Sequence, residues 1–186
     1  MPFFRRAIPA VTLVASLAAS AAGPVVLLGV WLDRPYPDGV ASGRPQLTPA
    51  AAIALTLAGV ALGIQRREAP SRTRRLVAGA CAAGATLVGL LILVDHFAYG
   101  TLRTDRFLAG AGGTPNDAVL PSFHTGLTLL LLGSALLTLD VRPRRGPPPG
   151  QCLALLAGHA VFLVLTGYAF GVPAAYRITS PPDAGM

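Results

Sequence analysis

Residues 76–94 read LVAGACAAGATLVGLLILV and contain no charged side chain. A helix needs about 20 apolar residues to cross the hydrocarbon layer of a bilayer, which is about 30 Å thick. Four further stretches have similar length and composition. The five predicted spans are 8–32, 47–64, 76–94, 119–139 and 152–172. Lipid offers the backbone no hydrogen-bond partner, so each predicted span is expected to be helical.

The fold predicted from these spans is an all-α, polytopic membrane helix bundle. Its five transmembrane helices form one membrane domain, residues 1–186. Only 12% of the residues are charged, whereas a soluble domain has about 25%. The net charge of +7 does not indicate nucleic-acid binding, because no run combines basic residues with exposed aromatic residues. The expected partner is the lipid bilayer.

The arginines predict the orientation, because short cytoplasmic loops collect positive charge. Arg5 and Arg6 precede the first span, and the connections 65–75 and 140–151 carry most of the other basic residues. Arginines on the opposite side are largely offset by aspartates. The sequence therefore predicts a bacterial inner-membrane protein with a cytoplasmic N-terminus and, after five crossings, an external C-terminus.

The first span also resembles a signal peptide, since two arginines precede an apolar run and the small residues 18–23. The run continues to Trp31, however, and is longer than an ordinary signal sequence. We expect an uncleaved helix, with cleavage as the alternative.

The chain contains an internal repeat. Residues 51–62 (AAIALTLAGVAL) align with 125–136 (TGLTLLLLGSAL), and 93–100 (LVDHFAYG) resemble 165–171 (LTGYAFG). The predicted unit is an outgoing helix, an external loop and a returning helix. Two such hairpins occur, and the fifth span opens a third.

Several of these segments resemble one protein family. Residues 47–62 (LTPAAAIALTLAGVAL) and 122–136 (SFHTGLTLLLLGSAL) are similar to the recurring inward helix of bacterial sensor histidine kinases. The sequence DRFL at 105–108 resembles part of that family's outer loop, and LTGYAFGV at 165–172 resembles the end of its next span. The resemblance is to the N-terminal multi-pass membrane sensor region and covers about residues 47–179.

The resemblance implies a sensory role without catalysis in this chain. The family continues with a further inward helix and soluble signalling domains, but this chain has no phosphoacceptor histidine region and no ATP-binding glycine boxes. We therefore expect that it is not itself an enzyme. The alternatives are a fragment, a prematurely ended reading frame or a chain that works alone.

Candidate sensing residues cluster near the predicted outer ends of the spans. His96 and His124 are expected at similar depth on the helices of one hairpin, so they are also weak candidates for binding a cofactor. His159 is expected about 13 Å deeper than His124, too far to share a ligand with it. Asp95 beside His96 is either a proton or ligand sensor or a headgroup-level residue that caps the loop. The candidate sensing residues are Asp95, His96, Tyr99, Asp105, His124 and Tyr168.

No cofactor and no metal are predicted, because the histidines and cysteines lack zinc-ligand spacing. Cys81 and Cys152 are expected to stay reduced.

Small residues predict where helices approach closely. Gly59, Gly63 and Gly133 are the glycines expected in helix packing, together with the series Ala15, Ala19 and Gly23. Packing within one chain is the favoured interpretation, and a homodimer face is the alternative.

The leading hypothesis is a membrane sensory or anchoring module of a bacterial two-component kinase, lacking the catalytic part and responding to an unknown small-molecule or physical stimulus. The alternatives are a small membrane redox subunit that uses His96 and His124 for haem or quinone, and a membrane scaffold without signalling.

Overall fold

The computed structural model describes residues 2–31, 48–66, 71–98, 123–141, 143 and 146–171. These residues form five α-helices and no strand, which confirms the all-α fold class. The helices are α1 (Pro2–Trp31), α2 (Pro49–Gln65), α3 (Arg72–Phe97), α5 (Phe123–Leu137) and α6 (Pro149–Ala169).

Local sequence signals set several helix ends. Thr48 caps α2 by accepting a hydrogen bond from the Ala51 amide at 3.3 Å, and Pro49 takes the first helical position, where no amide is needed. Ser71 caps α3 in the same way. After α6, Gly171 has a φ of 62°, the left-handed conformation that commonly ends a helix.

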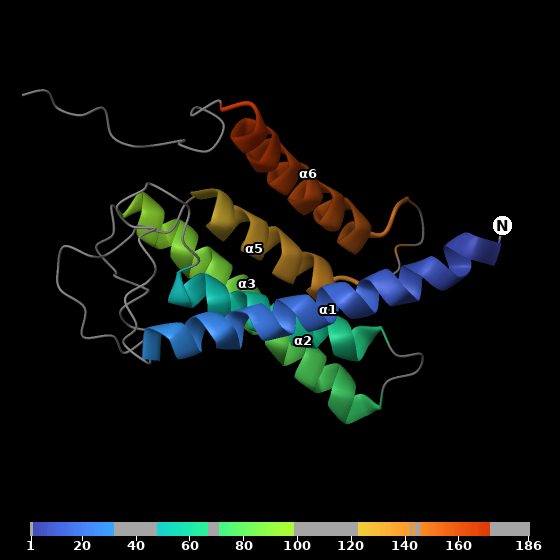
Figure 1. Ribbon diagram of the computed structural model, residues 1–186. Helices are drawn as coiled ribbons and strands as arrows, with labels where there is room; N and C mark the ends of the chain where they lie inside the picture. The colour runs from blue at the N-terminus through green and yellow to red at the C-terminus, as the bar shows by residue number, and fades with distance from the viewer. Residues whose placement is uncertain are drawn as a thin grey trace, which may run out of the picture.

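The helices form an up-and-down bundle (Figure 1). Helices α2, α3 and α5 contact one another at its centre, while α1 packs on α2 and α6 packs on α5. The start of α1, the end of α2, the start of α3, the end of α5 and the start of α6 lie at one end of the bundle. Arg66 follows α2, and Arg72, Arg74 and Arg75 lie in the first turn of α3, so we call this the arginine-bearing end.

The centre of the bundle is built mainly from small residues. Alanines from α2 and α3 pack around Val88, Ile92, Leu129 and Leu136. Large apolar side chains instead cover the outside: Leu155 is 74% exposed, and Val25 is 68% exposed. Water would oppose this arrangement, whereas lipid favours it, because helices in a membrane associate through close packing of small residues.

Three of the described helices are long and apolar enough to cross a membrane, over Ala10–Leu28, Arg72–Phe97 and Pro149–Gly167. They indicate a membrane protein. The other two are shorter, with 17 residues in α2 and 15 in α5, or about 26 Å and 23 Å. The fourth span, predicted as 119–139, is helical from Phe123 to Leu137 and then turns; residues 119–122 lie outside the described part.

Helices α1 and α2 are held together by small residues and one hydrogen bond. Ser16 is buried and donates its hydroxyl to the carbonyl oxygen of Gly59 at 3.0 Å. A Cβ added to Gly59 would lie 2.6 Å from the Ser20 amide nitrogen, and one added to Gly63 would lie 2.6 Å from Ser16 Oγ. Ser16 and Ser20 therefore share the close contact with α2 with the predicted Ala19 and Gly23, whereas Ala15, which was also expected to contribute, is exposed.

We expect Ser16→Ala to destabilise the bundle by about 1 kcal/mol, since an interhelical hydrogen bond in a membrane is worth roughly that much. Unfolding in mixed micelles with increasing SDS measures the change. Thr166→Ala is the matched control, because the Thr166 hydroxyl donates to Phe162 of its own helix at 2.7 Å. If both variants lost the same free energy of unfolding, the hydrogen bond between α1 and α2 would not stabilise the bundle more than a bond within one helix does.

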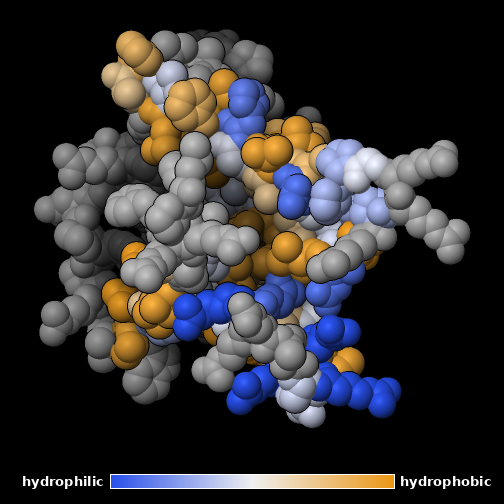
Figure 2. All heavy atoms as spheres, turned by 90° about the vertical axis from the view of Figure 1, so that its right-hand side faces the viewer, coloured by the Kyte–Doolittle hydropathy of each residue, from blue (hydrophilic) through white to orange (hydrophobic). Residues whose placement is uncertain are grey.

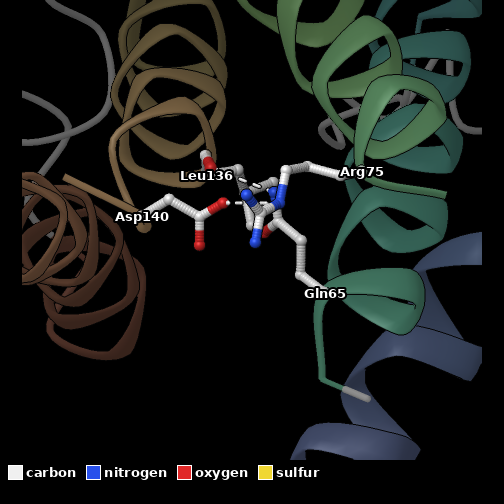
Figure 3. Close-up of polar contacts among 4 residues, drawn as sticks. All are labelled: Gln65, Arg75, Leu136 and Asp140. Atoms are coloured by element: carbon white, nitrogen blue, oxygen red, sulfur yellow. Dashed lines mark hydrogen bonds and ion pairs between the residues drawn. The ribbon is translucent and has the colours of Figure 1, made fainter. Parts of the chain in front are cut away.

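The arginine-bearing end carries a polar link between the central helices. Figure 2 faces this end and shows hydrophilic side chains gathered there, and the exposed arginines include Arg66, Arg72 and Arg74. Gln65 Nε2 donates to the Leu136 carbonyl oxygen at 3.1 Å, and Arg75 pairs with Asp140 at 3.5 Å (Figure 3). The ion pair is largely exposed and contributes little to stability. The hydrogen bond from α2 to α5 is therefore expected to stabilise this end more than the ion pair does.

Candidate functional site

The candidate site lies where α3 ends and α5 begins, and the register of these helices defines it. A Cβ added to Gly89 would lie 2.5 Å from the Leu130 amide nitrogen, and one added to Gly126 would lie 3.2 Å from that of Leu93. The two helices therefore run antiparallel with their backbones in close contact. Continuing the same register by one turn places His96 level with Phe123.

Four aromatic side chains meet at that level. We call His96, Phe97, Phe123 and His124 the ring cluster. The ring centroids of His96 and Phe123 are 5.9 Å apart, and those of Phe123 and His124 are 5.8 Å apart. Phe97 lies 6.0 Å from Phe123 at an interplanar angle of 80°, an edge-to-face contact. His96 and His124 thus lie at similar depth and share Phe123 as a neighbour.

Asp95 is buried within the bundle, two residues before the end of α3. Its exposed fraction is 2%, because it follows Val88 and Ile92 on the helix face that packs against α2. Helix α2 runs antiparallel to α3, so this face is directed toward the first turn of α2, around Ala50. The positive end of the α2 dipole is suited to stabilise a carboxylate there.

His124 has a buried, unsatisfied ring nitrogen. Its Nε2 atom makes no hydrogen bond to any part of the chain that the structure describes. A buried polar atom without a partner costs about 1–3 kcal/mol, and a hydrogen-bond partner for Nε2 would relieve this cost.

The other residues predicted for sensing or helix packing are not part of the ring cluster as far as the structure describes them. His159 lies exposed on α6, away from the ring cluster. Tyr99 and Asp105 lie outside the described residues, and of Tyr168 only the backbone, in α6, is described. Gly59 and Gly63 face α1. Gly133 faces Thr86 of α3, where an added Cβ would lie 2.7 Å from the amide nitrogen.

Phe123 was missed from the sequence, although it joins both histidines. The available signal was the position of Phe123 beside His124 at the start of a span. This position becomes informative only once the register between α3 and α5 is known. A single apolar residue among many gives no such indication.

The carboxyl and imidazole groups in this region can form hydrogen bonds. Within the described ranges, no three His, Cys, Asp or Glu side chains come together as metal ligands. Cys81 and Cys152 are free thiols, and both are remote in sequence from the ring cluster.

No family model, no curated protein and no solved structure matches this chain. A function therefore has to be argued from the arrangement of these helices and side chains.

Proposed function

We propose that all five helices cross a bilayer. The two short helices, α2 and α5, pack against α3 at the centre of the bundle, and the long α1 and α6 lie outside them. Non-helical backbone at membrane depth is tolerated where protein surrounds it. The neighbouring helices can thus shield the ends of α2 and α5, and local thinning of the bilayer can offset the rest of the mismatch.

The proposed location is the bacterial inner membrane, with the arginine-bearing end in the cytoplasm. This orientation is supported by the gathering of Arg66, Arg72, Arg74 and Arg75 at one end of the central helices. Asp95 and the ring cluster then belong to the external half of the bundle.

The topology predicts which positions a membrane-impermeant maleimide reaches in intact spheroplasts. In a chain with Cys81→Ala and Cys152→Ala, we expect Ala98→Cys to be labelled from outside and Thr73→Cys only after lysis. Thr73 lies in the first turn of α3, and Ala98 follows its last residue. Labelling of Asp140→Cys, at the cytoplasmic end of α5, should match Thr73→Cys. Labelling of Ala98→Cys and Thr73→Cys from the same side would contradict a crossing by α3.

Within this topology we propose a sensory or anchoring module for signal transduction that has no catalytic part of its own. The observation that carries the proposal is Asp95, a carboxylate 2% exposed in an apolar bundle. Ionisable residues at such positions are costly and are usually functional. The similarity of residues 47–62 and 122–136 to the inward helices of sensor kinases supports the same role.

The proposed mechanism is a shift in helix packing. A proton or ligand that reaches Asp95 or His124 changes the charge or the hydrogen bonding between α2, α3 and α5. Backbones in close contact move as rigid units between discrete arrangements rather than bending continuously. Helix α3 then carries the shift toward the arginine-bearing end, and the stimulus acts by favouring one of two arrangements.

Cys81 offers a native reporter for this shift. It lies in α3, about 21 Å along the helix from Asp95, and packs against the cluster of Ala58, Ala61 and Leu136. With Cys152→Ala, the alkylation rate of Cys81 in proteoliposomes should change as the external pH falls from 8 to 5, the range in which histidine titrates. A rate that follows only the intrinsic pH dependence of a thiol, measured on a model peptide, would contradict a proton stimulus.

The absorption spectrum of the purified protein separates this proposal from the redox alternative. A sensory module needs no Soret band. A band that is present in the wild type and lost in His124→Ala would overturn the sensory proposal and favour a haem-binding subunit.

A further inference from the structure

We propose that the outward face of α6 is an interface between two copies of this chain. The inference rests on the proposed crossing of the membrane by α6. Helix α6 packs on α5 through Ala157 and Gly150, and an added Cβ on Gly150 would lie 2.9 Å from the Ala135 carbonyl oxygen. The opposite side of α6 carries the interface.

The spacing on that opposite side is the spacing of a helix–helix seam. The residues recur alternately three and four positions apart, as in the apolar seam of a coiled coil. The seam residues are Cys152, Leu155, His159, Phe162 and Thr166. Leu155 is 74% exposed and Phe162 is 63% exposed, so this side of α6 makes no extensive contact with the described part of its own chain.

The side chain of His159 needs a hydrogen-bond partner on this face, which lipid cannot provide. It is the central residue of α6 (Pro149–Ala169), about 15 Å from either end, and therefore lies near the middle of the bilayer. Its side chain is exposed and forms no hydrogen bond within the described residues. Polar side chains at this depth almost always face protein, because hydrocarbon satisfies neither a donor nor an acceptor.

Hydroxyl groups in the same bundle are satisfied within the chain. Thr86 donates to Ala82 at 2.8 Å, Thr166 donates to Phe162 at 2.7 Å, and Ser16 reaches across to Gly59. Such a bond to the carbonyl four residues earlier can satisfy only one of the two imidazole nitrogens, and the other nitrogen still needs a partner. The partner of His159 must therefore come from outside the described helices.

A second copy of the chain can supply that partner at the same depth. Two copies inserted in the same direction pack α6 against α6 in parallel, and a twofold axis brings both His159 side chains to the same depth. A neutral imidazole has one donor and one acceptor, so the two rings can share one N–H···N hydrogen bond. Gly158 adjoins the seam and has open space around it, which permits close approach of the second helix.

Oxidative cross-linking at Cys152 tests this interface, because Cys152 is exposed and lies on the seam about 10 Å from His159. In membranes holding the full chain with Cys81→Ala, copper phenanthroline should produce a disulfide-linked dimer. The matched control retains Cys81 and carries Cys152→Ala. Cys81 is partly buried on α3, so this variant should stay monomeric. No dimer through Cys152, or equal dimer in both variants, would overturn the proposal.

The role of His159 is tested by two substitutions in the Cys81→Ala chain. We expect His159→Leu to lower the dimerisation constant by about three- to tenfold, the scale of one interhelical hydrogen bond. His159→Asn keeps a donor and an acceptor and should retain the dimer. Equal dimerisation of both variants would remove His159 from the interface.

The outcomes separate this inference from the proposed function. A chain that remains in alkali-washed membranes but gives no Cys152 dimer contradicts only the interface. A cross-linked product with the mass of a different protein also contradicts it. A chain that stays in solution without detergent contradicts the membrane proposal itself.

Discussion

Gly133→Ala will destabilise the bundle by about 2 kcal/mol, the usual scale for overpacking a tight contact. The added Cβ would lie 2.7 Å from the Thr86 amide nitrogen and 2.9 Å from its Cα atom. These atoms belong to the backbone of α3, so α3 and α5 must move apart. Moving them apart also disturbs the ring cluster nearly three turns away, because the same antiparallel contact places His96 against Phe123.

Gly79→Ala is the matched control on α3, since a Cβ at Gly79 meets nothing within 4 Å. It should leave stability unchanged or raise it by up to about 1 kcal/mol, because alanine favours helix more than glycine does. Unfolding in mixed SDS micelles, followed by circular dichroism, measures both variants. Equal free energies of unfolding for the two variants would mean that the close contact between α3 and α5 is not important for stability.

Asp95→Asn will abolish the pH-dependent change in Cys81 alkylation while keeping most of the stability. The amide is close in size to the carboxyl group and retains hydrogen bonding, but it cannot carry the negative charge on which the proposed mechanism depends. Asp95→Ala should lose the response as well and should lower the free energy of unfolding by about 1–3 kcal/mol, because the groups that Asp95 contacts are left without it. The measurements are the Cys81 alkylation rate in proteoliposomes and SDS unfolding.

Asp140→Asn provides the control for a carboxylate on the same bundle. Asp140 is exposed and pairs with the exposed Arg75, so the change should alter stability by less than about 1 kcal/mol and leave the Cys81 response intact. A response that survives Asp95→Asn and is lost in Asp140→Asn would shift the proposed mechanism to the arginine-bearing end.

The helices were largely predictable, because lipid-compatible composition over about 20 residues is a strong signal. The predicted span 76–94 became α3, Arg72–Phe97, since arginines can extend a helix beyond the hydrocarbon while their side chains reach the interface. The predicted span 119–139 became α5, which ends at Leu137, two residues earlier than predicted. Neighbouring helices shield this central helix, so it need not match the bilayer thickness that guided the prediction.

The faces of the helices were much less predictable. Nearly every residue within a span is apolar, so no alternation marks which side meets protein and which meets lipid. Of the predicted series, Ala19 and Gly23 do contact α2, whereas Ala15 is exposed, and the contacts of Ser16 and Ser20 were not predicted. Asp95 stands near a span end, where its charge alone allows either the headgroup layer or the interior. The burial of Asp95 follows only from the packing of its helix face, which includes Ile92, against α2.

The small-residue centre also constrains how such a sequence can change over time. Positions such as Gly23, Gly59, Gly89 and Gly133 admit almost no larger side chain, whereas the outer Leu, Val and Phe residues can replace one another freely in lipid. Homologues should therefore differ across most of their surface and agree at a sparse set of tiny residues. A search weighted toward those positions and their antiparallel spacing should find distant kin that overall identity would overlook.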